Sequence, residues 1–545
     1  MAAIDDRSPP VVRKTPLALA SSLVSGSLLL SGCGLVQDLE KPGEDGESPS
    51  PESPEPEPVE EDFPYTKTGR VFLDTGQDTE LELSITGLER TPEHTVLHYE
   101  ASYKDQLRGS NTRMSTPPTL VDPVNGRVYN QYIDEDGVTS YGSHGPKDSG
   151  RFPVHEGVAN EYRVYFPRIP EDVRQVTFVG RGMGAMTGIP IQDVEEEKPT
   201  PDPNGDEYVR TEPPDGTNLT FEVRRPDSEA QAVDVDLESF VDSDLASTTR
   251  DGDQETMALH SDVMFEFDES TLTGEAEEVV TKAAASLERN IDPESSEITV
   301  IGHTDGKGSD SYNDELSEER AETVRDLLRE ELGEDYAFDV EGRGSEEPVA
   351  EEGGPDDEEA RARNRRVEFS YEVDRDSPGQ DSGNGDQEDS LGAAERNVSE
   401  PAPFDPELGE VTASETEDDV RLDVYPLRRD GAYVIGTVEL TNTSDEPTEL
   451  EFDSEEARIP GGPDQFEKGT LGGFQLLEPD SDLVRYVAQM KSADGKYASL
   501  AEEVHELQPG EPYQLIAMFP APPGDVEELD MRAGPFGELE GIALE

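Results

Sequence analysis

The fold of the middle of this chain is decided by one stretch, Ile298-Thr299-Val300-Ile301-Gly302-His303-Thr304-Asp305. Its first four residues are apolar or β-branched and predict a buried β-strand. Ser317 follows and is typical of a helix cap. The helix that it would begin has apolar residues three or four positions apart: Ala321, Val324, Leu327 and Leu328. The stretch therefore predicts a strand, a polar loop and an amphipathic helix.

Outward from this unit, short strands alternate with helical patterns. Residues 274–290 predict a second helix, because apolar side chains recur at helical spacing: Ala276, Val279, Val280, Ala283, Ala284 and Leu287. Further strands are predicted at residues 263–267, 337–340 and 367–371. The expected architecture of residues 256–374 is an α/β (α+β) domain, with two main helices on one face of a four-stranded mixed sheet.

Several motifs of this segment resemble the OmpA-like peptidoglycan-binding domain family. They cover about a fifth of the chain in one consistent order, which is far more specific than a lone short motif. The motifs are Phe265-Glu266-Phe267-Asp268, Gly302-His303-Thr304-Asp305, Gly308, Tyr312-Asn313, Leu316-Ser317, Arg320-Ala321, Val324, Gly344 with Pro348, and Asn364-Arg365-Arg366-Val367-Glu368. The resemblance implies non-covalent binding of peptidoglycan by a domain that is not an enzyme.

The resemblance also implies a ligand and a site. In the family the ligand is the diaminopimelate of the peptide stem, and the two principal contacts fall on Asp305 and Arg320. Diaminopimelate carries an ammonium and a carboxylate on one carbon, so a fixed anion and a fixed cation suit it. Asn313 is expected to brace the loop, and Arg366 to add a polar contact to the stem.

Each of these roles has a structural alternative. Asp305 could cap a loop, and Arg320 could pair with Glu318 or Glu319. The two arginines at 365 and 366 could balance local acidic charge. His303 is expected to be structural, because no Ser, Cys or second His is placed to make it a catalytic base.

The N-terminal residues predict export and lipid anchoring. Arg13 and Lys14 precede a largely apolar run from Thr15 to Leu30, which is typical of a secretion signal and too short for a confident membrane span. The following Leu30-Ser31-Gly32-Cys33 resembles the lipobox of bacterial lipoproteins, in which the thiol is acylated, for example with palmitate. We expect cleavage after residue 32 and anchoring of Cys33, the single cysteine, in the cell membrane or outer membrane, facing the cell wall.

Residues 33–62 are predicted to be a disordered tether, because Glu, Pro and Ser dominate and leave nothing to form a core. Residues 63–225 and 405–545 contain short β-type runs between Gly, Pro, Asp and Asn, which predicts two β-sandwich-like domains. Acidic, Pro- and Gly-containing linkers are expected at 226–255 and 375–404.

The second β domain is predicted to repeat the first. Similar residues lie at one constant offset: Phe166-Pro167 with Phe519-Pro520, Val173 with Val526, Val176 with Leu529, and Gly188-Ile189 with Gly541-Ile542. A second set of similar residues aligns approximately, at a slightly different offset: Leu120, Tyr129 and Asp136-Gly137 with Leu477, Tyr486 and Asp494-Gly495.

The composition limits the possible partners and environment. The chain has 127 acidic against 44 basic residues, a formal net charge of −83, so its surface repels phosphate and nucleic acid is excluded as a partner. Concentrated salt screens such self-repulsion, since the Debye length falls to roughly 3 Å at 1 M. We expect a halophilic adaptation; an acidic secreted protein of ordinary salinity is the open alternative.

Neither cofactor nor metal is expected. Asp134-Glu135-Asp136-Gly137 lacks the ligand pattern of a calcium loop and is interpreted as a turn. The histidines of the β domains lack metal-ligand spacing: His94, His98, His144, His155 and His505. One alternative function remains open, a surface adhesion or partner-binding lipoprotein whose β domains bind an unidentified protein. A wall hydrolase would need a nucleophile, a zinc site or a pair of acids in a groove, and only abundant unpaired Asp and Glu point to one. A motor stator would need a transmembrane helix.

Overall fold

The computed structural model describes residues 63–545 apart from gaps at 74–77, 106–110, 113–117, 136, 138, 147–150, 267, 293–294, 296, 355–356, 374–397, 451–468, 480 and 492–496. The predicted signal peptide, Cys33 and the tether lie outside the described residues, as does most of the predicted linker at 375–404. All described residues belong to one compact unit, Val59–Glu545. None of the helices described there is long and apolar enough to cross a membrane.

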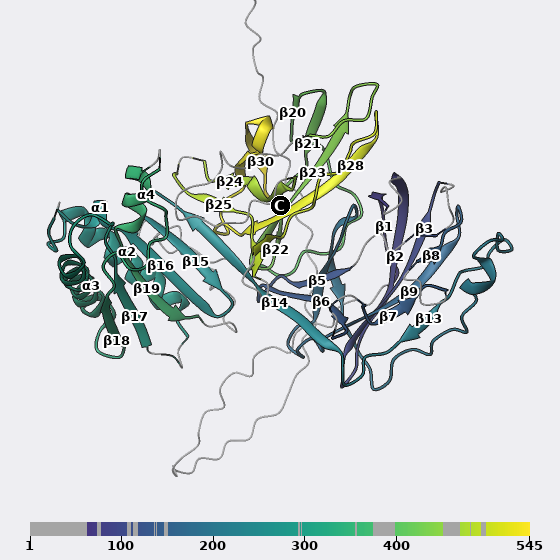
Figure 1. The fold of residues 1–545 in the computed structure, drawn as a ribbon, viewed down its shortest axis with the longest axis horizontal. Coiled ribbons are helices and arrows are strands. Elements are labelled where there is room, and N and C mark those ends of the chain that lie inside the picture. The colour runs from purple at the N-terminus through teal and green to yellow at the C-terminus, as the bar shows by residue number, and fades with distance from the viewer. Residues whose placement is uncertain are drawn as a thin grey trace, which may run out of the picture. The chain divides into compact units, whose positions relative to one another are not determined.

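The central segment alternates strands and helices. Its elements are β16 (Gln254–His260), α1 (Ser261–Met264), α2 (Gly274–Asn290), β17 (Glu297–Gly302), α3 (Asp310–Leu332), β18 (Ala337–Gly342), α4 (Asp357–Asn364) and β19 (Arg366–Glu372). The strands lie in the order β16-β19-β17-β18, with β17 and β18 parallel and the other pairs antiparallel. The helices α2 and α3 contact each other and share one apolar core with these strands (Figure 1).

Two boundaries predicted for this segment are wrong. The edge strand is β16 rather than residues 263–267, and Val263 and Met264 lie in the short helix α1. Helix α3 begins at Asp310 instead of Ser317. Its first two turns bury only polar side chains, those of Asn313 and Ser317, so hydrophobic periodicity cannot mark them.

The first β region consists of two sheets around one core. One sheet contains β1 (Tyr65–Phe72), β2 (Asp78–Arg90), β3 (Thr95–Tyr103), β9 (Ala159–Phe166), β7 (Gly142–His144) and β13 (Glu222–Arg224), with β12 (Gln192–Asp193) paired to β2. The strands of the other are β11 (Gly184–Pro190), β10 (Gln175–Gly180), β5 (Thr119–Asp122) and β6 (Arg127–Ile133). A short separate pair joins β4 (Asn111–Thr112) to β8 (Phe152–Pro153).

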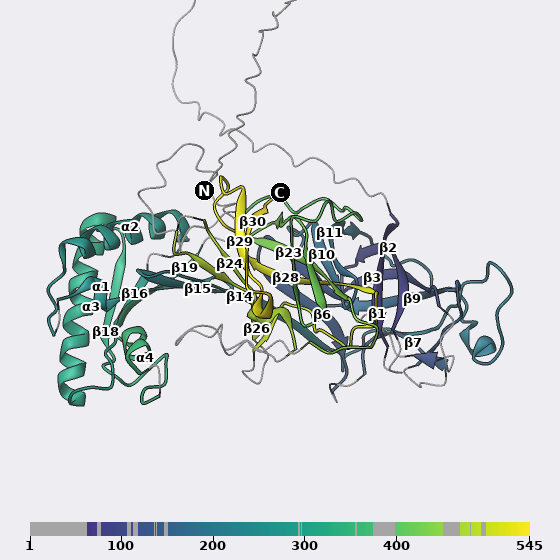
Figure 2. The ribbon, with the colours of Figure 1, turned by 90° about the horizontal axis from the view of Figure 1, so that it is seen from above.

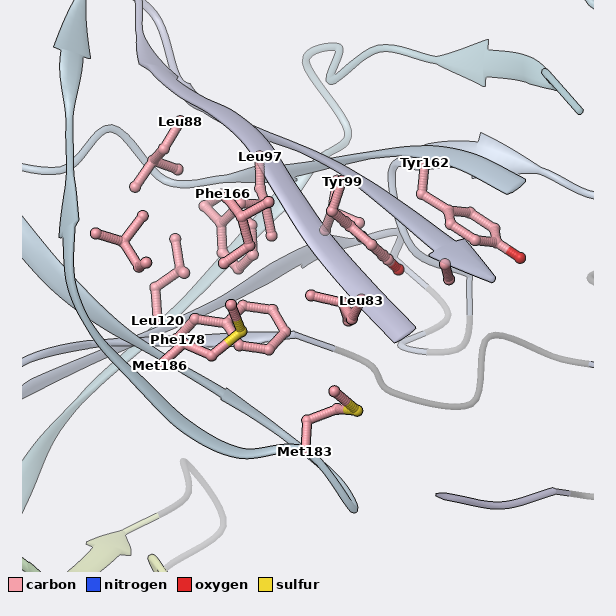
Figure 3. Packing of buried hydrophobic residues seen from close by; sticks show 14 of the residues in the cluster. Leu83, Leu88, Leu97, Tyr99, Leu120, Tyr162, Phe166, Phe178, Met183 and Met186 are labelled. Atoms are coloured by element: carbon pink, nitrogen blue, oxygen red, sulfur yellow. The ribbon is translucent and has the colours of Figure 1, made fainter. Parts of the chain in front are cut away.

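Side chains from both sheets meet in this core (Figure 3). Leu83 and Tyr99 come from the first sheet, and Leu120, Phe178 and Met186 come from the second. Because alternate residues of a strand face opposite sides, each sheet can present an apolar face to the other and a polar face outward.

The second β region is built in a similar way. One sheet contains β20 (Ala413–Glu417), β21 (Val420–Val424), β23 (Tyr433–Asn442), β22 (Arg428–Asp430) and β28 (Pro512–Pro520), which pairs with β23. The remaining strands are β24 (Gln475–Leu477), β25 (Val484–Tyr486), β26 (Gln489–Lys491), β27 (Tyr497–Ser499), β29 (Glu528–Arg532) and β30 (Glu538–Ala543). Strands of both groups contribute to one apolar cluster.

The hairpins β10–β11 and β29–β30 match in detail. Both are antiparallel, and both contain one register shift at the same place. The equivalent features are the facing pairs Val176–Ile189 and Leu529–Ile542, the shifts between Val176 and Phe178 and between Leu529 and Met531, and the positive φ of Gly188 (63°) and Gly541 (68°). A bulge recurring at one constant offset is a specific similarity, because bulges are conserved features of a strand pair.

Residues 226–255, predicted to be a linker, contain two strands, β14 (Gln231–Asp242) and β15 (Ala246–Asp251). β14 pairs with β6 near its start and with β15 near its end (Figure 2). It also pairs with β25 and β26. The strands of the central segment therefore belong to a 16-stranded sheet rather than to a separate four-stranded one. Acidic residues between Val233, Val235 and Leu237 make this strand look like a linker in the sequence.

Candidate functional site

Two glycines allow α3 to pass close to the ends of β17 and β18. Gly302 and Gly342 are neighbours across these parallel strands. A Cβ on Gly302 would lie 2.0 Å from the carbonyl oxygen of Ser317, and one on Gly342 would lie 2.6 Å from the amide nitrogen of Glu318. Any larger residue would push the helix away from the sheet. This close approach brings α3 next to the loop that contains Asp305.

The side chain of Asp305, in this loop, is 13% exposed. Its Oδ1 accepts a hydrogen bond from the amide of Lys307 (3.0 Å), and its Oδ2 accepts one from Nη1 of Arg365 (2.6 Å). The buried Asn313 donates from Nδ2 to the carbonyl oxygen of Asp305 (3.3 Å). The loop is thus held from α3, and the carboxylate from the strand side.

Arg320 of α3 is buried, at 6% exposure, and its charge interacts with those of Asp262 and Arg365. Its Nε donates to the carbonyl oxygen of Glu269 (3.0 Å), and its guanidinium carbon lies 4.9 Å from the ring centroid of Phe265. Burial lowers the pKa of Arg320, and the nearby Asp262 opposes that shift. Among the described residues, none accepts a hydrogen bond from its Nη atoms, so this fork is available to an anion.

Arg365 contacts Asp305 directly, whereas the sequence suggests only that it neutralises nearby acidic charge. Its Nε and Nη2 donate to the two carboxylate oxygens of Asp262 (2.7 and 2.6 Å), and Nη2 also reaches Glu358 (3.3 Å). Together with the bond to Asp305, these contacts raise the pKa of Arg365, with Asp262 as the largest cause. The Asn-Arg-Arg motif could have suggested this role, but not which of its two arginines reaches Asp305.

Arg366 has different neighbours. Its Nε donates to Glu368 (2.5 Å), and its Nη atoms donate to the carbonyl oxygens of Asn364 and Glu347 (3.3 and 3.2 Å). The buried His303 lies 3.7 Å from the other oxygen of Glu368. Burial alone would raise the pKa of Glu368, but His303 and Arg366 hold it down at about 2. In the part of the chain that the structure describes, no hydrogen bond joins Arg366 to Asp305 or to Arg320.

The rim of the site carries an aromatic side chain. Tyr312 is 42% exposed, and its hydroxyl donates to Asp268 (2.8 Å). That hydrogen bond raises the pKa of Tyr312. Asp268 has a left-handed φ of 63°, which Asp tolerates better than most residues. The site thus combines two guanidinium groups, four carboxylates and a phenol, a set suited to a small zwitterion. They belong to Arg320, Arg365, Asp262, Asp268, Asp305, Glu358 and Tyr312. Among the described residues, no cluster of three or more His, Cys, Asp or Glu side chains could hold a metal ion.

Comparison with known proteins finds similarity over the central segment. The model of the OmpA family matches residues 264–365. Outer membrane protein A of Shimwellia blattae is 37% identical over 91 residues, 17% of this chain and 37% of that protein. Outer membrane porin F of Pseudomonas aeruginosa is 37% identical over 121 residues, 22% of this chain and 33% of that protein. The chain spans about a third of these relatives' length.

Two solved structures are also similar over this segment. The OmpA-like domain of FopA1 from Francisella tularensis has 25% identity and a TM-score of 0.19, covering 24% of this chain and 81% of that one. The peptidoglycan-associated lipoprotein from Burkholderia pseudomallei has 28% identity and a TM-score of 0.17, covering 20% and 86%. On the strength of the matched segment, residues 264–365 form a domain of the OmpA family.

Proposed function

We propose that this chain binds peptidoglycan non-covalently through its OmpA domain, with the diaminopimelate of the stem peptide as the group recognised. The observation that supports the proposal is that the carboxylate of Asp305 and the buried guanidinium of Arg320 both have Arg365 as a charged neighbour. Asp305 would accept the ligand's ammonium, and the Nη atoms of Arg320 would donate to its carboxylate. No group in this set is placed as a nucleophile, so the proposed activity is binding and not catalysis.

Charge explains why this arrangement suits a zwitterion. Arg320 is desolvated, and an anion beside its fork would offset the cost of burying it. Asp305 already holds Arg365, but a carboxylate offers about four lone-pair positions and can accept a further donor. A ligand with both charges on one carbon could contact both protein groups, whereas a ligand that carries only one charge would gain only one of these contacts.

Asn313 and Arg366 are expected to contribute differently to the proposed site. We take Asn313 as the brace of the loop, because it is buried and donates to the backbone of Asp305. A contact between Arg366 and the stem would require its guanidinium to leave Glu368 and two carbonyl oxygens. We therefore rank Arg366 behind the other residues as a ligand contact.

The proposed cellular role is a tether between membrane and wall. Acylation of Cys33 would anchor the chain in the cell membrane or outer membrane, and residues 33–62 would span the distance to the first β region. We further propose that the two flanking regions are sandwich-like repeats of one ancestral domain, supported by their matching hairpins. The acidic surface is proposed to be an adaptation to salt.

A second candidate function is partner binding by the first β region. A polar pocket of about 820 Å³ lies against β2 and β3 and beneath the loop around residues 210–218. Glu82, Ser84, Glu100 and Ser102 contribute to its lining. This pocket favours a polar partner, and binding there is compatible with attachment to the wall through the OmpA domain.

Co-sedimentation with purified walls tests the first function. The full chain should pellet with walls whose stems contain diaminopimelate and much less with walls that have lysine at that position, because lysine lacks the side-chain carboxylate. Equal pelleting with both wall types would contradict recognition of diaminopimelate. No pelleting with either would contradict peptidoglycan binding.

A further inference from the structure

A small pocket lies over the strands that lead into the OmpA domain. It has a volume of about 60 Å³, and its lining includes Ser239 of β14, Thr248 and Arg250 of β15, and Glu255 of β16. The strand register places Ser239 opposite Arg250 and Arg250 opposite Glu255, so these side chains form one row across three strands. Residues of both β regions complete the lining, among them Asn125 and Tyr433.

Three hydrogen-bond donors of this pocket are shielded from solvent. They are Nη1 and Nη2 of Arg250 and Oγ1 of Thr248, and none of them bonds to a described residue. Thr248 is 6% exposed, and Arg250 uses only its Nε, which donates to the carbonyl oxygen of Gly252 at 3.3 Å. Leaving a buried charged donor unpaired is costly, and native structures rarely do so.

The nearby acid does not supply the acceptor. Glu255 is 3% exposed, and its Oε1 accepts hydrogen bonds from the hydroxyl of Tyr371 and from Nδ2 of Asn290. Within the described residues, Arg250 forms no ion pair with a carboxylate oxygen within 4.0 Å. The Nη atoms of Arg250, which lines the pocket, are therefore left without an acceptor among the described residues.

We propose that this pocket is a binding site for a small oxyanion of the phosphate or carboxylate class. A guanidinium fork donates two parallel hydrogen bonds to two oxygens of such an ion, a geometry that a spherical halide does not match. The Thr248 hydroxyl would donate a third. The site is separate from Asp305 and Arg320 and does not depend on peptidoglycan binding.

Calorimetric titration of the full chain with sodium phosphate, and separately with sodium acetate, in about 0.1 M sodium chloride tests the proposal. The wild type should show saturable binding of at least one of the two ions. Arg250→Met keeps the bulk of the side chain and removes the fork, so it should weaken binding by roughly tenfold or more. Arg250→Lys and Thr248→Val should each weaken it by a smaller factor.

Arg289→Met is the matched control, because Arg289 is exposed on α2, does not line the pocket, and bonds only within its helix in the structure described. It should bind as the wild type does, which separates the site from a general loss of positive charge. Thermal unfolding of each variant establishes that it is folded. If Arg250→Met does not fold, the binding affinities of Arg250→Lys and Thr248→Val test the proposal in its place. Undiminished binding in the folded variants, or no saturable binding of either ion by the wild type, would overturn the proposal.

Discussion

The carboxylate of Asp305 accepts a 2.6 Å hydrogen bond from Nη1 of Arg365, a residue that is itself held by both oxygens of Asp262. The anion expected to meet the ligand's ammonium therefore already has a cation beside it. That cation fixes the direction of the carboxylate, leaving Oδ1 with only the amide of Lys307 as its recorded donor among the described residues. Binding of an ammonium would add to this arrangement rather than require its collapse.

Removing either member of the Asp305 and Arg320 pair should nearly abolish binding of a diaminopimelate-containing stem peptide. Each of Asp305→Ala and Arg320→Ala leaves one ligand charge unmatched in a partly desolvated site, at a cost of about 2–5 kcal/mol. Arg320→Lys keeps the charge but loses the fork, so it should bind more weakly than wild type and better than the alanine variant. Calorimetric titration measures all three.

The control for this series is Arg325→Ala, on the same helix, because Arg325 pairs with its neighbour Asp326 and not with the loop. It should retain wild-type affinity. Wild-type affinity in both Asp305→Ala and Arg320→Ala would show that the site is elsewhere.

Replacing Cys33 with serine should release the chain from the membrane. Only the thiol serves as the acyl acceptor, so Cys33→Ser is expected in the medium or as uncleaved precursor. Fractionation followed by detergent extraction measures the change. Membrane association of the variant that still requires detergent for release would contradict lipid anchoring at this residue.

Glu502 should make stability depend on pH. It accepts hydrogen bonds from the amides of Gly182 and Ile516, and burial raises its pKa from 4.5 to about 7. The folded state then holds this proton more tightly than the unfolded state, so the contribution to stability decreases as pH rises from about 4.5 to about 7, by on the order of 3 kcal/mol. The melting temperature should change less with pH across this range in Glu502→Gln than in the wild type.

Glu503→Gln is the control for that experiment, since the adjacent Glu503 is 50% exposed and its loss removes the same formal charge. The melting temperature of this variant should change with pH as that of the wild type does. Equal slopes for all three proteins would mean that Glu502 does not titrate in this range.

Salt should stabilise the full chain. The acidic surface repels itself most when the Debye length is long, so the melting temperature should rise between roughly 0.1 and 2 M of a salt with little stabilising effect of its own. A flat or falling melting temperature would contradict the salt adaptation proposed for this composition.

The sequence predicts most of the OmpA domain because its helices and inner strands have strong apolar periodicity. Asp305 and Arg320 are candidate ligand contacts because their motifs resemble those of the family, and they stay predictions. The contact between Arg365 and Asp305 could not be predicted, because the sequence does not distinguish the two adjacent arginines. The structure distinguishes them: Arg366, in β19, pairs with Glu368, and Arg365 bonds to Asp305. The strand β14 is also hidden, because backbone pairing on both of its edges, rather than side-chain hydrophobicity, determines its structure.

The continuous strand β14 has a mechanical consequence. A wall-bound domain on a loose hinge would swing freely, and tension would simply straighten the hinge. Here the backbone of β14 leaves its ladder with β6 and enters its ladder with β15 without a break. A pull between an anchored N-terminus and a wall-bound OmpA domain would load these hydrogen bonds along the strand, in shear, so that many must fail together before the chain extends.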